Sequence, residues 1–344
     1  MSAAPEPSLG GIPPVIDTLS PPSAIAGGDF EILGSHLSSG DRQSIVRFGD
    51  VTARLVIGGE RRIVVRVPEE AVEGALTVES LGESSEIMTC ALGFPVADDL
   101  HPVASPAVDD DGNIYTTQSG TRGEKVPVSV FKIDTSHTVH PFASEIVNPT
   151  GLVMSPWGDL LVSGRNNGTV YSVTPSGSVS VYAEGMGVAT GIAMDGDQNL
   201  YVGDRTGTIF KIAPDRQIFV FATMEPSISA FHLAFGPDGG LYVTGPTTSS
   251  FDAVYRINPD GEVSDYVRGF GRPQGIAFDR DGNLYVATSY QGRKGVFRID
   301  ETKAVTQVLS GPGIVGLAFR PSGDVVLTTT TSVYRVSTDG WAPE

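Results

Sequence analysis

The feature of this sequence that most constrains its fold is an internal repeat. The phrase DRDGNLYVAT at residues 279–288 has close relatives at Asp109, Gly196 and Gly236. When the copies are aligned on the residue pair that follows the turn, they recur at intervals of roughly 40 to 46 residues, which is the spacing of a repeat architecture. The aligned pairs are Ile114–Tyr115, Leu160–Leu161, Leu200–Tyr201, Leu241–Tyr242, Leu284–Tyr285 and Val325–Val326.

Each of these six copies contains four short segments in which apolar and polar residues alternate. In the fifth copy the segments are 275–278, 283–287, 295–299 and 304–309, and turns rich in Asp, Gly, Asn and Pro separate them. Four strands per repeat at this spacing is typical of a β-propeller blade, whose apolar faces are covered by neighbouring blades. The sequence therefore predicts an all-β protein in which residues 92–340 form a six-bladed NHL-like β-propeller.

The sixth copy is too short to supply its own fourth strand. After residues 332–336 only STDGWAPE remains, whereas an unassigned apolar stretch, CALGFPVA at Cys90–Ala97, comes immediately before the first copy. We expect this N-terminal strand to become the outer strand of the last blade. Such an arrangement would close the ring and cover an exposed sheet edge.

Residues 12–91 lack the repeat and contain a series of short alternating segments that predict an Ig-like β-sandwich. A proline-led first strand, PPVIDTLSP, followed by AGGDFEILG, VRFGD and VVRVPE, resembles an IPT/TIG domain. The resemblance implies a module for spacing or protein contact that has no chemistry of its own. We expect residues 1–11 to be a disordered N-terminus.

The repeats themselves resemble NHL-repeat propellers and, more loosely, the lactonase family that includes the gluconolactonases. RPQGIAFDRDGNLYVA and ATGIAMDGDQNLYVGD carry this likeness. The resemblance implies a ligand site over the central channel. In the metal-dependent lactonases it also implies a Glu, an Asn and an Asp at the mouth of the channel, where they hold a divalent cation that polarises the lactone and activates water.

This chain departs from the lactonase pattern at the mouth of the channel. It has Ala104-Ser105-Pro106 where the family has Glu-Gly-Pro, Thr190 where Asn is expected and Gln274 where Asp is expected. Neutral hydroxyl and amide groups are weak ligands for a hard cation. We therefore predict no metal site and no cofactor, and whether the chain is an enzyme stays open. If it is a lactone hydrolase with a divergent site, a divalent cation (Ca, Mn or Zn) would be its cofactor.

Two sets of residues on the loop face of the propeller are candidates for ligand binding. The predicted channel-mouth residues are Ser105, Thr150, Thr190, His232 and Gln274. The predicted basic rim consists of cations in the loops after the second strands, with one aromatic residue: Arg122, Arg165, Arg205, Arg293 and Tyr290. The turns on the opposite face are strongly acidic, so this rim collects cations in an acidic protein.

Arginine can bind a carboxylate or a phosphate in a bidentate manner. The basic rim therefore favours a binding or scaffold protein that recognises an anionic small molecule or an acidic protein segment. Two alternatives stay open. One is a gluconolactonase-like hydrolase, and the other is a structural subunit of a larger assembly with a protein partner.

Composition restricts the remaining possibilities. The formal net charge of -17 argues against nucleic acid as a partner, and no apolar run is long enough for a membrane helix, so we expect no membrane insertion. The single cysteine, Cys90, excludes an internal disulfide. The N-terminal residues lack the pattern of a signal peptide, which predicts a cytoplasmic protein, or an exported one if a leader has been removed.

Overall fold

The computed structural model describes residues 11–39, 44–71, 74–118, 126–249 and 251–341. Over these residues the chain contains strands and turns and no helix, so no helix capable of crossing a membrane occurs in this part of the chain. Residues 1–10 of the predicted disordered segment 1–11, and Arg122, lie outside the described residues.

The chain divides into two compact units. The first comprises Met1–Gly93, Leu309–Gly311 and Asp339–Glu344, and the second comprises Phe94–Val308 and Pro312–Thr338.

The first unit is built on one continuous eight-stranded sheet with the order β1-β3-β6-β5-β4-β7-β8, in which β9 also pairs with β7. Its strands are β1 (Val15–Ser20), β3 (Asp29–Ser35), β4 (Ile45–Phe48), β5 (Val51–Ile57), β6 (Arg62–Arg66), β7 (Ala75–Ser80), β8 (Glu83–Ser84) and β9 (Met88–Thr89). Two further strands, β2 (Ser23–Ala24) and β10 (Ala91–Leu92), form a short parallel pair.

The sheet of the first unit is continuous because β5 changes partner along its length. Its first residues pair with β4, where Ala53 lies opposite Val46, and its later residues pair with β6, where Arg54 lies opposite Arg66. The alternate residues Phe30 and Ile32 of β3 point into a single core. The strands of this sheet share one core, and the Ig-like sandwich stays a prediction.

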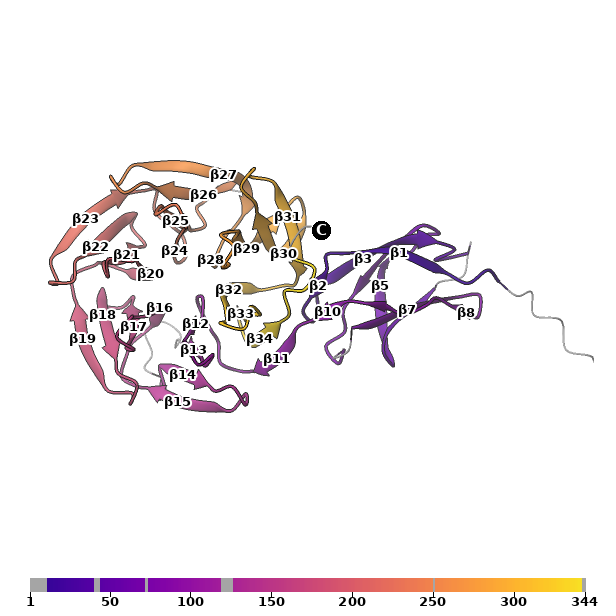
Figure 1. The fold of residues 1–344 in the computed structure, drawn as a ribbon, viewed down its shortest axis with the longest axis horizontal. Coiled ribbons are helices and arrows are strands. Elements are labelled where there is room, and N and C mark those ends of the chain that lie inside the picture. The colour runs from indigo at the N-terminus through magenta and orange to yellow at the C-terminus, as the bar shows by residue number, and fades with distance from the viewer. Residues whose placement is uncertain (1–10, 40–43, 72–73, 119–125, 250, 342–344) are drawn as a thin grey trace, which may run out of the picture. The chain divides into compact units, whose positions relative to one another are not determined.

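The second unit consists of sheets arranged around a central axis (Figure 1). Three of them contain four consecutive strands each. Their strands are β12 (Ala107–Val108), β13 (Ile114–Thr117), β14 (Val130–Ile133) and β15 (Val139–Ala143); β16 (Pro149–Met154), β17 (Leu160–Gly164), β18 (Thr169–Val173) and β19 (Val179–Ala183); and β20 (Ala189–Met194), β21 (Leu200–Asp204), β22 (Thr208–Ile212) and β23 (Ile218–Thr223). In each sheet the first strand is innermost and the fourth is outermost (Figure 1).

The next two repeats share one sheet. Their strands are β24 (His232–Phe235), β25 (Leu241–Thr244), β26 (Asp252–Ile257), β27 (Val263–Gly271), β28 (Ile276–Phe278), β29 (Leu284–Tyr290), β30 (Arg293–Ile299) and β31 (Val305–Ser310). The long strands β27 and β29 pair at Phe270 with Tyr290 and at Gly271 with Ser289, and this pairing joins the two runs of four. The propeller-like all-β arrangement is confirmed, whereas the count of six separate blades stays a prediction.

A strand from the start of the second unit completes its last sheet. β32 (Ile314–Phe319), β33 (Val325–Thr329) and β34 (Val333–Val336) pair in order, and β11 (Phe94–Ala97) pairs antiparallel with β34. Val96 is buried in a cluster with Val326. The expectation that a segment within Cys90–Ala97 supplies the missing outer strand is confirmed.

The repeated phrase of the sequence has a common hydrogen-bonded structure. Asp279 accepts hydrogen bonds at Oδ1 from the backbone N of Asn283 (2.8 Å) and at Oδ2 from Asn283 Nδ2 (2.9 Å) and the Tyr285 hydroxyl (3.0 Å). The Tyr285 ring packs against Phe319 of the next repeat at a centroid distance of 4.9 Å. The same hydrogen bonds join Asp109 with Asn113 and Tyr115, and Asp195 with Asn199 and Tyr201. The acidic turns are therefore held rigidly by their own side chains.

Candidate functional site

The strand register of the second unit defines one equivalent position in each repeat, in the inner strand or just before it. In β16 this position is Gly151. It lies three residues before Met154, and Met154 pairs with Leu160, the first residue of the second strand β17. We call the set of equivalent residues the ring position. Its members are Ser105, Gly151, Gly191, His232, Gly275 and Gly316.

Glycine occupies four of these positions because neighbouring inner strands approach each other closely there. A Cβ atom on Gly316 would lie 2.3 Å from the Cα atom of Ser105, and one on Gly275 would lie 2.5 Å from the Cα atom of Gly316. A Cβ atom on Gly191 would lie 2.2 Å from the carbonyl oxygen of Phe231. None of the four glycines has a positive φ, so crowding rather than backbone conformation excludes a side chain.

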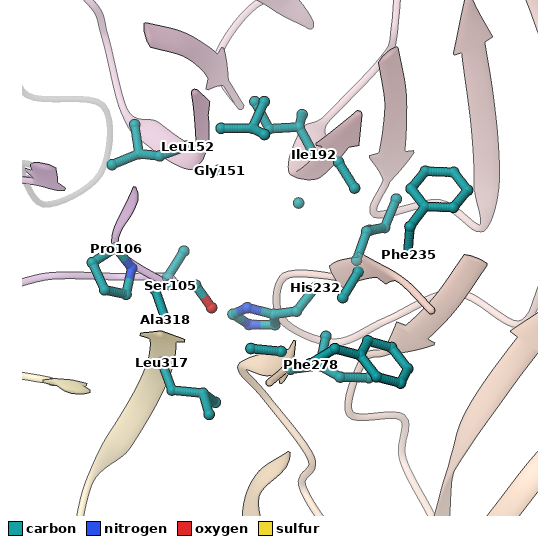
Figure 2. Close-up of a pocket in the computed structure, with 18 of the residues that line it drawn as sticks. Ser105, Pro106, Gly151, Leu152, Ile192, His232, Phe235, Phe278, Leu317 and Ala318 are labelled. Carbon is teal, nitrogen blue, oxygen red and sulfur yellow. The ribbon is translucent and has the colours of Figure 1, made fainter. Parts of the chain in front are cut away.

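His232 and Ser105 are the two ring positions that carry a side chain. Figure 2 shows the Ser105 hydroxyl pointing toward the imidazole of His232. Within the described part of the chain, neither Ser105 Oγ nor His232 Nε2 has a hydrogen-bond partner, although both atoms are buried. Burial lowers the pKa of His232 to about 4, so the imidazole is uncharged at neutral pH.

These two side chains line a cavity of about 380 Å³ in the central channel. The rest of its wall is formed by inner-strand residues, most of them apolar, including Leu152, Phe235 and Phe278 (Figure 2). Among the residues described, no Asp, Glu, Lys or Arg lines this cavity. The described lining of the channel is therefore uncharged.

The register divides the five predicted channel-mouth residues into two levels. Val108 pairs with Ile114, which makes Ser105 the equivalent of Gly151 and of His232, whereas Thr150, Thr190 and Gln274 each lie one residue earlier in their repeats.

The other predicted channel-mouth residues do not line the cavity. Thr190 is buried, and its hydroxyl donates to the carbonyl of Gly203 (2.8 Å) and accepts from the backbone N of Phe231 (3.1 Å). Thr150 is also buried, and its hydroxyl donates to the carbonyl of Asn148 (3.3 Å). Gln274 is half-buried outside the lining. Of the five predicted residues, the structure brings together Ser105 and His232 only.

Sequence reasoning missed a set of hydroxyl groups that link inner strands to the preceding repeat. Ser163 donates to the carbonyl of Thr190, and Thr328 donates to the carbonyl of Ala104 (2.8 Å). Thr244 makes the same kind of bond to the carbonyl of Gln274. The sequence feature that could have predicted these bonds is a Ser or Thr as the fourth residue of a second strand. These bonds hold the mouth of the channel in place.

Two residues of the predicted basic rim influence each other. Arg165 directly follows β17, and Arg205 directly follows β21. Burial, together with the positive charge of Arg205, lowers the pKa of Arg165. In the described ranges neither guanidinium lies within ion-pair distance of a carboxylate, and Arg205 Nε donates to the carbonyl of Ser227 at 3.3 Å. The rim thus contains two neighbouring cations that no carboxylate in this part of the chain neutralises.

The remaining rim residues are placed differently. Arg293 is exposed at the start of β30. Tyr290 is half-buried and packs against Phe270 and Phe297, at centroid distances of 5.3 and 5.8 Å. Its ring is therefore part of an aromatic cluster. Arg122 lies outside the described residues.

Among the described residues, no group of three His, Cys, Asp or Glu side chains is placed to hold a metal ion. The lactonase-like positions hold Ala104, Thr190 and Gln274, and the Thr190 hydroxyl is already used in two hydrogen bonds.

Comparison with known proteins gives structural likeness without sequence likeness. No protein-family model matches the chain, and no curated protein matches its sequence. A gluconolactonase from Xanthomonas campestris is 14% identical, with a TM-score of 0.58 over 72% of this chain and 89% of that one. An auxiliary nutrient binding protein from Bacteroides thetaiotaomicron is 12% identical, with a TM-score of 0.55 over 95% of this chain and 98% of that one.

A structural genomics protein of unknown function from Bacteroides thetaiotaomicron covers even more of the molecule. It is 14% identical, with a TM-score of 0.56 over 97% of this chain and 100% of that one. At such identities a structural likeness shows the fold alone. The fold class is accordingly that of β-propeller proteins, and the activity has to be argued from the site.

Proposed function

We propose that this protein is a binding protein that recognises an anionic small molecule through Arg165 and Arg205 on the loop face of its propeller. The observation that carries the proposal is that the half-buried Arg165 lies near the charge of Arg205 and that no carboxylate of the described residues forms an ion pair with either; burial and the neighbouring charge both lower the pKa of Arg165. Both causes disfavour the charged form, yet an arginine stays protonated in a protein at neutral pH. A bound carboxylate or phosphate relieves both effects at once.

The geometry of the rim supports this role. The backbone N of Arg165 donates to the carbonyl of Asn148 (3.2 Å), and the backbone N of Arg205 donates to the carbonyl of Val188 (3.0 Å). The backbone of each residue is therefore tied to the residue that precedes an inner strand. Two neighbouring guanidinium groups suit a small, multiply charged anion, because one anion can accept hydrogen bonds from both.

The same proposal includes the finer architecture. The runs β24–β27 and β28–β31 each have four strands in chain order, and we count them as two blades of a six-bladed propeller. The first unit then serves as an IPT/TIG-type module that spaces the propeller from, or attaches it to, another protein. Reduced proteolysis of the first unit in the presence of a co-purifying partner would support that role.

Charge reversal tests the anion site. We expect phosphate, citrate or gluconate to bind the wild type in calorimetric titrations, and Arg165→Glu or Arg205→Glu to weaken binding at least about tenfold. Arg280→Glu is the matched control, because Arg280 is an exposed cation in a turn between a first and a second strand. Equal affinity in the wild type and in both rim variants would contradict the proposal, as would failure of all three anions to bind the wild type.

The alternative of a metal-dependent lactonase has less support. The structural likeness to a gluconolactonase favours it, but the channel mouth of this chain offers Ala104 and an already bonded Thr190 instead of acidic ligands. Hydrolysis of glucono-δ-lactone that stops on addition of a chelator and returns with a divalent cation would favour the lactonase over the binding protein.

A further inference from the structure

We infer that the protein forms a homodimer in which two copies pair their β23 strands antiparallel about a two-fold axis at Phe219. β23 is the outermost strand of its sheet, and no strand of the described residues pairs with its outer edge (Figure 1). The free N–H and C=O groups of such an edge can pair with a strand of another chain. This inference goes beyond the anion site at Arg165 and Arg205 and does not depend on it.

The side chains at this edge are apolar and exposed. Ile218, Phe219 and Val220 are 40%, 49% and 65% exposed, and they form the longest run of exposed large apolar residues in the part of the chain that the structure describes. All eight residues from Gln217 to Met224 are uncharged. An exposed, apolar and uncharged edge strand is the type that associates with another strand.

Three of the other outer strands carry residues that discourage such pairing. β15 contains Pro141 and β11 contains Pro95, and a proline has no N–H group to donate to a neighbouring strand. β27 carries the exposed charges of Asp265 and Arg268. Charged side chains and prolines are the usual means by which proteins protect a sheet edge.

The remaining two outer strands are covered by other groups. In β19 the carbonyl of Tyr182 already accepts a hydrogen bond from Arg216 Nη1 (3.2 Å), and the guanidinium lies over the Tyr182 ring. Leu309 of β31 pairs with β2. β23 has neither a proline, nor a charge, nor a covering strand, so it is the outer strand best suited to pair with another chain.

The hydrogen-bond pattern of β23 determines which of its backbone groups face the open edge. The turn before β23 is closed by a hydrogen bond from the backbone N of Ala213 to the carbonyl of Gln217 (2.9 Å). Hydrogen-bonded and non-hydrogen-bonded pairs alternate along an antiparallel ladder, so Ile218 and Val220 direct their N–H and C=O groups away from β22. Beyond them, a turn of the next repeat lies close to the edge, since a Cβ atom on Gly261 would be 2.3 Å from the carbonyl oxygen of Phe221.

One antiparallel register satisfies all of these free groups. In this register Ile218 of each copy lies opposite Val220 of the other, and each such pair exchanges two hydrogen bonds. Phe219 then lies opposite its own equivalent on the two-fold axis, in a non-hydrogen-bonded pair whose side chains are close together. Aromatic side chains that meet in this way stabilise strand pairing. Because the same surface is used by both copies, the assembly closes at two.

The charge of the protein favours a second copy as the occupant of this edge. Each chain has a formal net charge of -17, so two copies repel each other wherever their acidic surfaces meet. The uncharged run from Gln217 to Met224 lets two copies pair with no charged side chain on either strand. The paired segment is short compared with a standard interface, so we expect a reversible dimer with a dissociation constant on the order of 10–100 µM.

Sedimentation velocity measures this association in the full chain. We expect the wild type to change from monomer to dimer as its concentration rises through the range given above. Val220→Lys places a charge on the paired edge and should raise the dissociation constant at least about tenfold. Val181→Lys is the matched control, because Val181 is 57% exposed on the outer strand β19. It should leave the dissociation constant unchanged.

Disulfide formation tests the register. In a non-hydrogen-bonded pair the Cα atoms are about 4.5 Å apart, which a disulfide can span, so Phe219→Cys should form covalent dimers under mild oxidation. Ile218→Cys is the control, since its equivalents lie diagonally at about 7–8 Å, at or beyond the reach of a disulfide. We expect it to cross-link at least about tenfold more slowly. Cys90 is buried and does not compete in either variant.

Three results would overturn the inference. The first is a wild type that stays monomeric up to about 1 mM. The second is a dimer whose dissociation constant is the same in Val220→Lys as in the wild type, which would place the interface elsewhere. The third is cross-linking of Ile218→Cys as fast as that of Phe219→Cys, which would exclude the two-fold axis at Phe219.

Discussion

His232 predicts how the stability of the propeller depends on pH. Burial lowers its pKa from 6.5 to about 4, so between these values the unfolded chain holds a proton that the folded unit does not. The folded state is therefore unaffected above pH 7 and is destabilised progressively as the pH falls from 6.5 toward 4. At about 1.36 kcal/mol for each pKa unit, the full loss is about 3 kcal/mol, of which about 2 kcal/mol is reached at pH 5.

Urea unfolding followed by tryptophan fluorescence measures this loss. Of the two tryptophans, Trp157 belongs to the propeller and Trp341 to the first unit, so a Trp341→Phe background reports on the propeller alone. We expect the free energy of unfolding to fall by about 2 kcal/mol between pH 7 and pH 5, and this fall to disappear in His232→Asn but not in His101→Asn. An equal fall in the His232 variant would refute the reasoning, because the proton uptake would then belong to other groups.

Two further predictions concern crowding and burial. In thermal melts, Gly316→Ala should destabilise the propeller by about 1–3 kcal/mol, because the added Cβ atom would lie 2.3 Å from the Cα atom of Ser105. Gly196→Ala is the control. It has open space around it and should change the stability by less than about 0.5 kcal/mol. Burial raises the pKa of Cys90 to about 12, so a thiol reagent at pH 8 should react on the order of a thousandfold more slowly with folded than with unfolded protein, and rapid labelling in native buffer would contradict this.

Much of the propeller was predictable because its repeat is local. The pair Leu284–Tyr285 and its equivalents each begin a second strand, and in three of the repeats the turn before the pair is held by its own Asp and Asn, so short segments carry their own structural information. The strand β11 was predictable for a different reason, since the last repeat was short of one strand and an apolar segment before the first repeat had no other assignment.

The features that were missed depend on contacts between repeats. The pairing of β27 with β29, which joins two repeats in one sheet, arises from strands that run past the usual blade length, and their turn signals do not show this. That Ser105 lies at a different level from Thr150 and Thr190 was not predicted either. Pro106 follows Ser105 and β12 has only two residues, so the first repeat offers few residues to align.

The candidate site was only partly predictable. That Arg165 and Arg205 occupy equivalent places in successive repeats could be predicted from the repeat spacing. The sequence also placed Ser105 and His232 at the channel mouth, but it did not show that these two, and not Thr150, Thr190 or Gln274, line the cavity, because that depends on the strand register. The hydroxyl of Thr190 shows the opposite error, since a polar residue expected to face a ligand instead serves a neighbouring strand.

The pairing of β11 with β34 has a consequence for biosynthesis. Ala97 lies opposite Val333, so one of the first propeller strands to leave the ribosome has to wait for nearly the last one before it can pair. The intervening sheets can form as they are made, because each contains strands that follow one another in the chain. The final sheet can form only after release of the C-terminal residues. Ring closure is therefore a late step of folding that carries a large entropic cost. Until then β11 has no partner strand and its edge is open to pairing with other chains.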